Sequence, residues 1–371
     1  VTLMPVIGEV KYARGSQDDP TSGLWSYADR SKEVARPGYY SVPLTRYGIT
    51  AEMTATERVG FHRYTFPASE EAAIVIDLQN GGCWDKTTEA VIKQVNDKCI
   101  EGYRYSKGWA NDQKVYFVAE FSKPMQELEI TDNGLFGRVK YSTEADEQIY
   151  VKVALSPVSI EGAKANMQAE LPDWNFEKTI KAADKAWNQE LAKMRITSTD
   201  ESAKRVFYTG LYHTMIAPSE FCDVNGDYRG ADGKMHKNPG YTTYTTYSLW
   251  DTYRAAMPLM TIMHPERMTD MVNTMLAIND EQGRLPVWHL WGCETDCMVG
   301  NPGIVAVADA IIKDVEGVDQ ERAFAAIKQT AMNEGRGNNL RMMYGYIPFD
   351  EFTKESVAFD MEYALADGAA A

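Results

Sequence analysis

The sequence has few cysteines, and their arrangement is not typical of a zinc site. Its five cysteines, Cys83, Cys99, Cys222, Cys293 and Cys297, are an odd and scattered set. None of them forms the paired C-x-x-C spacing of a structural zinc site. We therefore expect free, partly buried thiols. Cys293 and Cys297 lie four residues apart, so a disulfide bond or a shared helical face stays open for that pair.

The sequence also has no long hydrophobic run and no excess of positive charge. No apolar stretch approaches the roughly 18 residues of a membrane helix, so we expect a soluble, folded chain without membrane insertion. The formal net charge of −15 disfavours nucleic acid and anionic lipid as partners, because the long-range field repels phosphate groups. A neutral ligand or a cation is favoured instead.

Aromatic residues are abundant by contrast. The 8 Trp and 21 Tyr supply flat apolar faces with hydrogen-bonding edges, the kind of surface on which sugar rings stack. A large core with ordinary surface tyrosines would give the same composition. Aromatic content is therefore compatible with sugar binding but does not identify it.

The first part of the chain has a period of two. At 371 residues the chain is longer than one hydrophobic core usually supports, so two domains are expected. Apolar and polar residues alternate over residues 49–56 and again over 114–121, with turn-like breaks rich in Gly, Asn and Asp between such runs. This pattern predicts an N-terminal antiparallel β-sandwich.

From Pro172 onward the period changes to 3.6. Residues 173–194 predict an amphipathic helix that connects the two halves, with Trp174, Ile180, Ala183 and Trp187 along one side. The remaining helices are expected over 201–215, 265–283, 301–317, 319–335 and 353–371. Successive helices with short connections fit an α/α barrel or a helical solenoid.

These patterns divide the chain into three parts. We assign residues 1–165 to a β-sandwich domain, 166–198 to a helical linker and 199–371 to the first part of a helical barrel. The last helix runs to the final residue without a stop signal, which indicates a chain cut inside a domain. No signal peptide is visible and the sequence starts at Val1, which fits a processed or trimmed product.

One polar loop resembles the first half of a calcium site. Asp223, Asn225 and Asp227 alternate as in a calcium-binding loop. However, Tyr228 stands where an EF-hand needs Gly, and Lys234 stands where the bidentate Glu should be. The loop is therefore no EF-hand. It is either a turn-rich polar loop or a set of oxygen ligands for a hard cation.

A second group of candidate residues falls within one helical turn. Trp250, Asp251 and Arg254 could direct an indole, a carboxylate and a guanidinium toward one cavity. The alternative is an ion pair between Asp251 and Arg254 within the helix, which needs no ligand.

The segment 288–301, WHLWGCETDCMVGN, gathers two Trp, a His, two Cys and two acids between apolar runs. Such an aromatic connection is typical of a pocket wall. Hydrolysis of a glycosidic bond needs one protonated and one ionised carboxyl group. Glu294 lies among apolar side chains that we expect to raise its pKa. Asp296, two residues on, does not share its helical face and is a poor partner base. A carboxylate at a helix start is the alternative role for Glu294.

Six segments follow one another in a characteristic order: PGYYSV at 37–42, TAEMTATERVGFHRYTFP at 50–67, GYRYSKGWANDQKVYFVAEFSKP at 102–124, YSLWDTYRAAMPL at 247–259, GRLPVWHLWGCETDCMVGNPG at 283–303 and KESVAFDMEYALAD at 354–367. Together they resemble the calcium-dependent exo-acting α-mannosidases of glycoside hydrolase family 92. The resemblance covers almost all of residues 5–370.

The resemblance implies a β-sandwich packed on an (α/α)6 barrel and hydrolysis of terminal α-mannosyl linkages with inversion. It implies Ca²⁺ as the cofactor, a mannose-containing glycan as the substrate, and export to the bacterial periplasm or cell exterior. The family's general acid falls on Glu294, within G-x-E-T-x-x-M-x-G. Substrate contacts are expected from Trp250, Asp251, Arg254, Trp288, His289, Lys354 and Glu355.

The chain departs from the family pattern in two respects. Lys354 stands where many α-1,2-specific members have His, while Glu355 is kept, so the linkage preference is not fixed. Members of the family are longer at both ends, so the general base and the calcium ligands are expected outside this sequence. We therefore expect a further segment or chain to complete the barrel, because half a barrel exposes its apolar inner faces.

Two other functions stay open at this stage. A non-catalytic glycan-binding protein would keep the sugar-stacking walls and lack the base. An (α/α)-barrel glycoside phosphorylase would depend on phosphate, which the acidic balance and the absence of a visible anion-binding loop disfavour.

Overall fold

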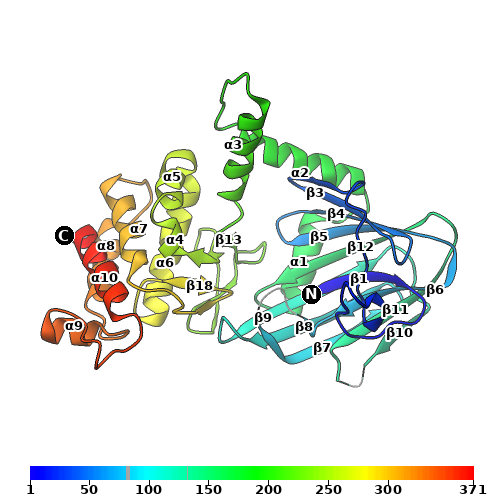
Figure 1. The fold of residues 1–371 in the computed structure, drawn as a ribbon, viewed down its shortest axis with the longest axis horizontal. Coiled ribbons are helices and arrows are strands. Elements are labelled where there is room, and N and C mark those ends of the chain that lie inside the picture. Colours follow the sequence, from blue (N-terminus) through cyan, green and yellow to red (C-terminus); the bar gives the residue numbers. More distant parts are fainter. Residues whose placement is uncertain (81–83, 132) are drawn as a thin grey trace. The chain divides into compact units, whose positions relative to one another are not determined.

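The computed structural model describes residues 1–80, 84–131 and 133–371, which form two compact units (Figure 1). The first unit comprises residues 1–108 and 114–208, and the second comprises residues 109–113 and 209–371. Among the described residues, no helix has both the length and the apolar character needed to cross a bilayer. Cys83 lies outside the described residues.

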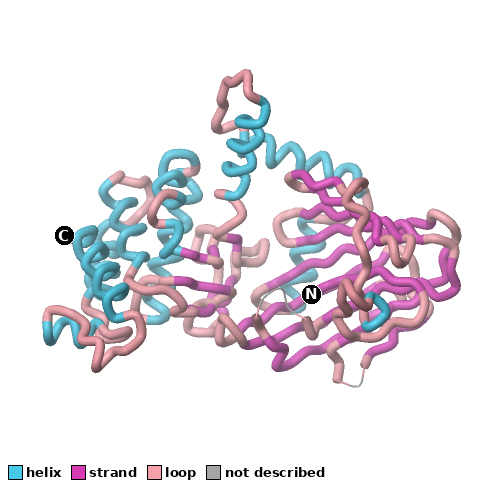
Figure 2. Tube along the Cα trace, viewed as in Figure 1, coloured by secondary structure: helices cyan, strands magenta, loops and turns pink. Residues whose placement is uncertain are grey.

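The first unit consists mainly of antiparallel strands, as Figure 2 shows. Its strands in chain order are β1 (Thr2–Ile7), β2 (Val34–Arg36), β3 (Tyr39–Leu44), β4 (Ile49–Ala55), β5 (Val59–Phe66), β6 (Ser69–Asp77), β7 (Lys86–Asn96), β8 (Cys99–Lys107), β9 (Gln113–Phe121), β10 (Glu127–Ile130), β11 (Phe136–Thr143) and β12 (Glu147–Ser156). Within the described residues they form a four-stranded sheet, β1-β6-β11-β10, and an eight-stranded sheet, β2-β3-β4-β5-β12-β9-β8-β7. A short 3-10 helix covers Pro20–Ser22.

The two sheets share one hydrophobic core. Residues such as Ile74 on β6, Val139 on β11 and Phe121 on β9 are fully buried within it. The outer face of the larger sheet is covered by α1 (Ile160–Glu170) and α2 (Phe176–Leu191), and a second apolar cluster joins these helices to the sheet. The predicted β-sandwich is thus confirmed.

Because helices cover the larger sheet, its strands do not simply alternate between buried apolar and exposed polar side chains. On β4, Ile49 and Ala51 are buried in the sandwich core, but Glu52 is also buried, on the opposite face. Its carboxylate accepts two hydrogen bonds of 2.6 Å from Arg63 and one of 2.7 Å from the Tyr39 hydroxyl. A buried carboxylate requires such partners, so both faces of β4 are packed.

The connecting helix begins later than its apolar pattern predicts. Asn175 caps α2 by accepting from the Lys178 backbone N–H at 3.0 Å, and the buried residues of α2 are Phe176, Thr179 and Ile180. Trp174 precedes the helix, so the prediction that it lies on the helical face is wrong. The pattern also missed α1, whose apolar face is short.

The second unit contains the remaining helices and several two- or three-residue strands. These are α3 (Glu201–His213, which begins in the first unit), β13 (Ser219–Glu220), β14 (Tyr228–Arg229), β15 (Met235–His236), β16 (Tyr244–Thr245), β17 (Tyr247–Ser248), α4 (Leu249–Thr252), α5 (Ala256–Met263), α6 (Pro265–Gln282), β18 (Trp288–Leu290), β19 (Cys293–Glu294), α7 (Pro302–Ile312), α8 (Gln320–Ala331), α9 (Asn338–Tyr344) and α10 (Ser356–Ala370). Helices α5 to α8 and α10 pack around one apolar cluster.

Helix α6 agrees closely with the sequence pattern. It begins at Pro265, and its core-facing residues are buried, as the i, i+3, i+4 spacing predicts. Gly283 ends it with φ of 85°, in the left-handed conformation that favours glycine. In contrast, α7 and α8 end at Ile312 and Ala331, several residues before the glycines expected to close them.

Candidate active site

The aromatic segment that begins at Trp288 is a β-hairpin. Strands β18 and β19 pair in antiparallel register, with Leu290 opposite Cys293, and β17 extends the sheet on the other side of β18. Between the strands, Trp291 and Gly292 have φ of 52° and 78°, the two left-handed residues of a type I′ hairpin turn. Glu294 therefore lies in a strand, and its alternative role at a helix start is wrong.

The Glu294 carboxylate accepts four backbone hydrogen bonds. Its Oε2 accepts from the N–H of Val287 at 2.8 Å. Its Oε1 accepts from the N–H groups of Trp288 at 2.9 Å, Thr295 at 3.0 Å and Asp296 at 3.0 Å. The side chain thereby joins the two arms of the hairpin beyond the last strand pair.

These contacts reverse the expected pKa of Glu294. Burial, the largest single effect, raises it, but the Arg284 guanidinium and the backbone N–H groups together outweigh burial and hold the pKa below its ordinary value. The expectation that an apolar shell keeps this carboxyl protonated is therefore wrong. The reason is that the atoms closest to the carboxylate are amide donors rather than indole carbons.

An ion-pair network flanks this carboxylate. Arg284 donates from Nη2 to both oxygens of Asp296, at 2.6 and 2.7 Å. Arg336 approaches Asp296 at 3.3 Å through Nε, donates to the Gly300 carbonyl at 2.7 Å and also donates to the Met298 carbonyl. Sequence spacing gave no sign of either arginine, because each lies in a different loop.

The hairpin presents two aromatic side chains to other aromatic residues. The ring centroids of Trp288 and Trp109 are 4.4 Å apart. The ring centroids of Trp291 and Phe221 are 5.5 Å apart, and these two rings meet edge-on. Trp109 is far away in sequence, so the pattern did not identify it as a neighbour. The prediction of free thiols holds for the described cysteines, including Cys293 and Cys297.

His289, on the same hairpin, is buried and neutral. Neither ring nitrogen has a hydrogen-bond partner within the described chain. Burial lowers its pKa to about 4, and nearby Arg229 adds to the effect, while Glu294 opposes it. His289 and Arg229 line one small cavity, and two guanidinium nitrogens of Arg229 are likewise buried without a hydrogen-bond partner. The third, Nη2, binds Asp112 at 2.6 Å.

Trp250 and Arg254 contact each other, but the alternative of an ion pair between Asp251 and Arg254 is not found. Asp251 accepts a hydrogen bond from the Ser248 hydroxyl. Arg254 instead pairs with Glu362 of α10 at 2.8 Å, and its guanidinium lies over the Trp250 ring at 4.9 Å. The indole N–H of Trp250 is buried without an acceptor within the described residues. The intrahelical ion pair is therefore wrong.

Lys354 and Glu355 lie in the turn before α10, and both side chains are exposed. Glu355 has φ of 56°, an uncommon conformation for a residue with a side chain. Neither side chain forms a hydrogen bond or ion pair with Glu294, so the structure does not join them directly to the hairpin.

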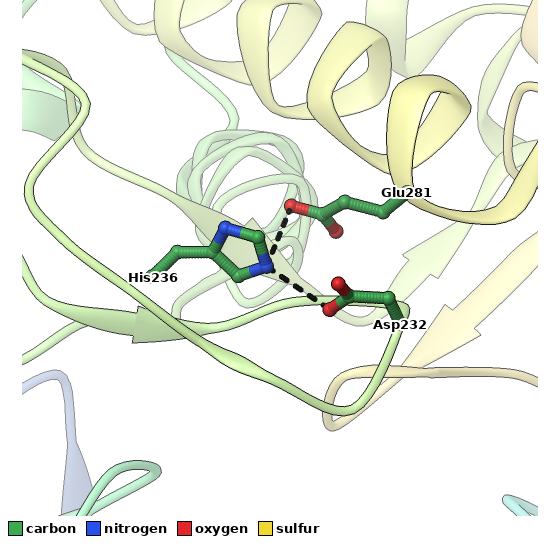
Figure 3. A group of neighbouring side chains, drawn as sticks. All are labelled: Asp232, His236 and Glu281. Carbon is green, nitrogen blue, oxygen red and sulfur yellow. Dashed lines mark hydrogen bonds and ion pairs between the residues drawn. The ribbon is translucent and has the colours of Figure 1, made fainter.

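One candidate cation cluster occurs among the described residues (Figure 3). His236 Nε2 lies 3.0 Å from Asp232 Oδ1 and 3.8 Å from Glu281 Oε1. Glu281 already accepts from the Tyr228 hydroxyl and the Ala231 N–H. Calcium takes six to eight oxygen ligands, whereas this cluster offers two carboxylates and a nitrogen. The cluster does not fit calcium.

The loop from Asp223 to Asp227 does not fit calcium either. Asp227 accepts from the Lys237 ammonium at 2.9 Å and from the Asn238 N–H at 3.2 Å. The Asn225 side chain accepts from the Asp227 N–H at 3.0 Å, which makes an Asx turn. Because the Lys237 ammonium already binds the Asp227 carboxylate, the segment is a turn-rich polar loop.

Two family models match the chain in succession. The glycosyl hydrolase family 92 N-terminal domain matches residues 1–156, and the glycosyl hydrolase family 92 catalytic domain matches residues 162–371. Together they account for nearly the whole chain. Among curated proteins, an uncharacterized secreted glycosidase of Arthroderma benhamiae is 23% identical over 389 residues, which is 90% of this chain and 45% of that protein.

Solved structures show the same fold. A family GH92 α-mannosidase from Bacteroides thetaiotaomicron is 37% identical, with a TM-score of 0.95 over 99% of this chain and 52% of its own. A family GH92 inverting mannosidase from Bacteroides thetaiotaomicron VPI-5482 is 27% identical, with a TM-score of 0.85 over 98% of this chain and 51% of its own. The predicted β-sandwich followed by part of a helical barrel is confirmed. The chain spans about half the length of these relatives.

Proposed function

This chain belongs to glycosyl hydrolase family 92, and on that basis we propose that it takes part in hydrolysing terminal α-mannosyl linkages of glycans. The observation that carries the proposal is the 37% identity and TM-score of 0.95, over 99% of the chain, with an α-mannosidase. Because the chain spans about half of that relative, the activity is proposed for the molecule in which the chain operates.

We propose that the reaction proceeds with inversion at the anomeric carbon. The 27% identical relative is described as an inverting mannosidase. Inversion requires an acid on one face of the glycosidic bond and, roughly 6.5–9.5 Å away, a base that activates water on the other. We assign the base to a residue outside this sequence, as the family pattern implies.

Substrate contacts are proposed for Trp250, Asp251, Arg254, Trp288, His289, Lys354 and Glu355. Three features support this set. The indole N–H of Trp250 and both nitrogens of His289 lack partners within the described chain, and a buried polar group without a partner is costly unless a ligand or water supplies one. The backbone of Glu355 is in the left-handed conformation, with φ of 56°. Strained backbone of this kind recurs at functional sites.

The assignment of the proton donor to Glu294 stays a prediction of the family resemblance. It is supported by the position of Glu294 beside Trp288 and by its G-x-E-T-x-x-M-x-G context. It also requires the acid form of a carboxyl group whose pKa is lowered.

Calcium dependence is proposed from the family resemblance alone. Among the described residues, neither the cluster of Asp232, His236 and Glu281 nor the loop from Asp223 to Asp227 presents a calcium ligand set. Export of the protein is likewise proposed, supported by the secreted relative from Arthroderma benhamiae.

The proposed function is tested on the molecule in which the chain operates. Proton NMR follows its hydrolysis of an aryl α-mannoside and of α-mannobiose. We expect β-mannose to appear before the α anomer, because inversion fixes the first product. Chelation should abolish turnover, and added Ca²⁺ should restore it. α-Mannose as the first product would contradict inversion.

A glycan-binding role without catalysis is the alternative, and the lowered pKa of Glu294 favours it. Calorimetry with the same mannosides separates the two. Heat of binding without any product would support a binding protein, and phosphate-dependent turnover would instead indicate a phosphorylase.

A further inference from the structure

Three side chains that can ligate a metal converge between the β14–β15 hairpin and the end of α6 (Figure 3). Asp232 lies in the turn of that hairpin, His236 lies on β15, and Glu281 lies in the last turn of α6. One ligand atom from each lies within 4.8 Å of the other two. His236 Nε2 is 3.0 Å from Asp232 Oδ1 and 3.8 Å from Glu281 Oε1. A single ion placed between them could contact all three.

The separations within this cluster match the ligand shell of a small transition ion. Zinc binds imidazole nitrogen and carboxylate oxygen at about 2.0–2.2 Å. At a tetrahedral angle, two such ligand atoms lie about 3.3–3.6 Å apart. The two distances from His236 Nε2, 3.0 and 3.8 Å, bracket this value. One imidazole with two carboxylates is also a ligand set that suits zinc, whereas calcium prefers six to eight oxygens.

The Glu281 carboxylate is buried and needs a positive charge beside it. Its side chain is 8% exposed. It accepts hydrogen bonds from the Tyr228 hydroxyl at 2.8 Å and the Ala231 N–H at 2.6 Å, and both donors are neutral. Among the described residues, no lysine or arginine forms an ion pair with it, and His236 supplies charge only if protonated. Buried charges are paired or coordinate metals, so the missing charge is either a proton on His236 or a bound cation.

The Asp232 carboxylate keeps a free acceptor position for such a cation. Its Oδ1 accepts from the Lys234 backbone N–H at 3.0 Å and faces His236 as well. The Lys234 ammonium lies 3.3 Å from the other oxygen, Oδ2, and 78% of that lysine side chain is exposed. Backbone donors of this kind fix the orientation of ligating carboxylates in metal sites.

The imidazole of His236 is held in place by its neighbours. The Tyr228 ring stacks on it, with ring centroids 5.1 Å apart and the planes inclined by 21°. The backbone of Gly230 also comes close: a β-carbon there would lie 2.7 Å from His236 Nε2 and 2.8 Å from Glu281 Cδ. Glycine at position 230 therefore leaves the room in which the two ligands meet. The cluster is preorganised, as a metal site requires.

We propose that Asp232, His236 and Glu281 bind a divalent transition ion, Zn²⁺ in particular, at a site separate from the calcium of the proposed function. The ion binds His236 Nε2 and one oxygen of each carboxylate, and it takes the place of a proton on Nε2. A water molecule completes the shell, as in other zinc sites with three protein ligands. Because the ligands come from the hairpin and from α6, the ion joins these two elements and stabilises the hairpin that carries Arg229.

Calorimetric titration with Zn²⁺ tests the site on the molecule in which the chain operates. The protein is first treated with a chelator and then kept in excess Ca²⁺, so that any calcium site is filled. We expect one Zn²⁺ to bind per chain at neutral pH, more weakly at acid pH because protons compete for the three ligands. Zn²⁺ should also raise the temperature of unfolding, because it binds the folded state. The measurement needs no turnover, so its result is independent of mannoside hydrolysis.

Three substitutions of similar shape remove one ligand each: Asp232→Asn, His236→Gln and Glu281→Gln. Loss of an outer-shell partner typically costs 10–100-fold in metal affinity, so loss of a ligand should weaken Zn²⁺ binding at least about 100-fold. The amide oxygen of E281Q can still accept from Tyr228 and Ala231, which favours retention of the fold. His213→Gln, at an exposed histidine on α3, is the matched control and should keep the affinity of the wild type.

Cobalt(II) in place of zinc identifies the ligands by absorption. We expect visible bands from nitrogen and oxygen ligands, absent in H236Q, and no near-ultraviolet thiolate band. A thiolate band would assign the ion to a cysteine and overturn the proposal, as would equal affinity of the wild type and the three variants. Absence of Zn²⁺ binding at neutral pH would show that the cluster is only a hydrogen-bonded triad around a protonated His236. If E281Q does not fold, D232N and H236Q still decide, because their side chains lie nearer the surface.

Discussion

At His289, burial determines the charge of a side chain whose ordinary pKa lies near physiological pH. Its pKa in the folded protein is about 4, against an ordinary value of 6.5. Between these values the unfolded chain binds more protons, so the free energy of unfolding falls as the pH is lowered through this window. The stability contributed by neutral His289 is fully present above pH 6.5.

We expect H289L to show a shallower loss of stability than the wild type between pH 6.5 and 5. Between pH 6.5 and 5 the wild type should lose of order 1–3 kcal/mol more free energy of unfolding than H289L, from the size of the pKa shift of His289. Chemical denaturation at several pH values measures it. His62, whose pKa is also lowered to about 4, keeps part of the slope in both proteins.

His213→Gln, at an exposed position near the end of α3, is the control and should follow the wild type. Identical slopes for H289L and the wild type would show that His289 is not held neutral. The range stops at pH 5 because Glu294 contributes separately: its lowered pKa gives stability that is lost only in more acidic solution.

The hairpin of β18 and β19 depends on two left-handed residues. A β-carbon at position 292 would lie 3.2 Å from a Phe221 ring carbon and 3.4 Å from the Arg229 carbonyl, at φ of 78°. We expect Gly292→Ala to lower the free energy of unfolding by about 1–2 kcal/mol for the left-handed backbone alone, with a further loss from this contact.

Gly233→Ala separates the two causes. Gly233 has a similar φ of 75°, but a β-carbon there would meet nothing within 4 Å. Thermal or chemical unfolding of both variants should give a larger loss for G292A. Equal losses would mean that the close approach of Phe221 and Arg229 has no energetic effect.

Elements with a strong period were predictable, whereas short ones were not. Helix α6 carries one continuous apolar face that fits the helical period, and its bounds follow from Pro265 and Gly283. Strands β17 to β19 have two or three residues each, which is too short for any period. Their pairing depends on residues such as Thr245, which accepts the Trp291 N–H at 2.7 Å from 46 positions away.

On the scale of the whole molecule, the helical unit leaves apolar side chains exposed. Val357, Met361 and Leu365 recur every four residues on α10 and expose 71%, 70% and 44% of their surface. Such spacing places them on one helical face. A contiguous apolar stripe of this kind is typical of an interface.

We expect the isolated chain to self-associate with rising concentration through this stripe. Sedimentation velocity should show a larger species, and V357K with M361E should shift the chain toward the monomer because charges on the stripe oppose association. Replacing Lys328 and Glu321 on α8 by Gln tests surface charge in general and should leave the distribution unchanged. A concentration-independent monomer for the wild type would contradict the prediction.

The amino-acid sequence by itself determined the β-then-α order, most long elements and the aromatic segment at 288–301, because hydrophobic periodicity and turn residues act over a few neighbouring positions. The order of six motifs also sufficed to indicate the family.

Only the tertiary structure decided the chemistry of Glu294. Its hydrogen-bond partners are four backbone N–H groups, and the nearby charge of Arg284 lowers its pKa. The direction of these groups depends on how the hairpin and the loop at 284 fold together. A side chain's apolar neighbours in sequence predict a raised pKa, whereas the donors that point at it in space lower it, since electrostatics follows distance through space.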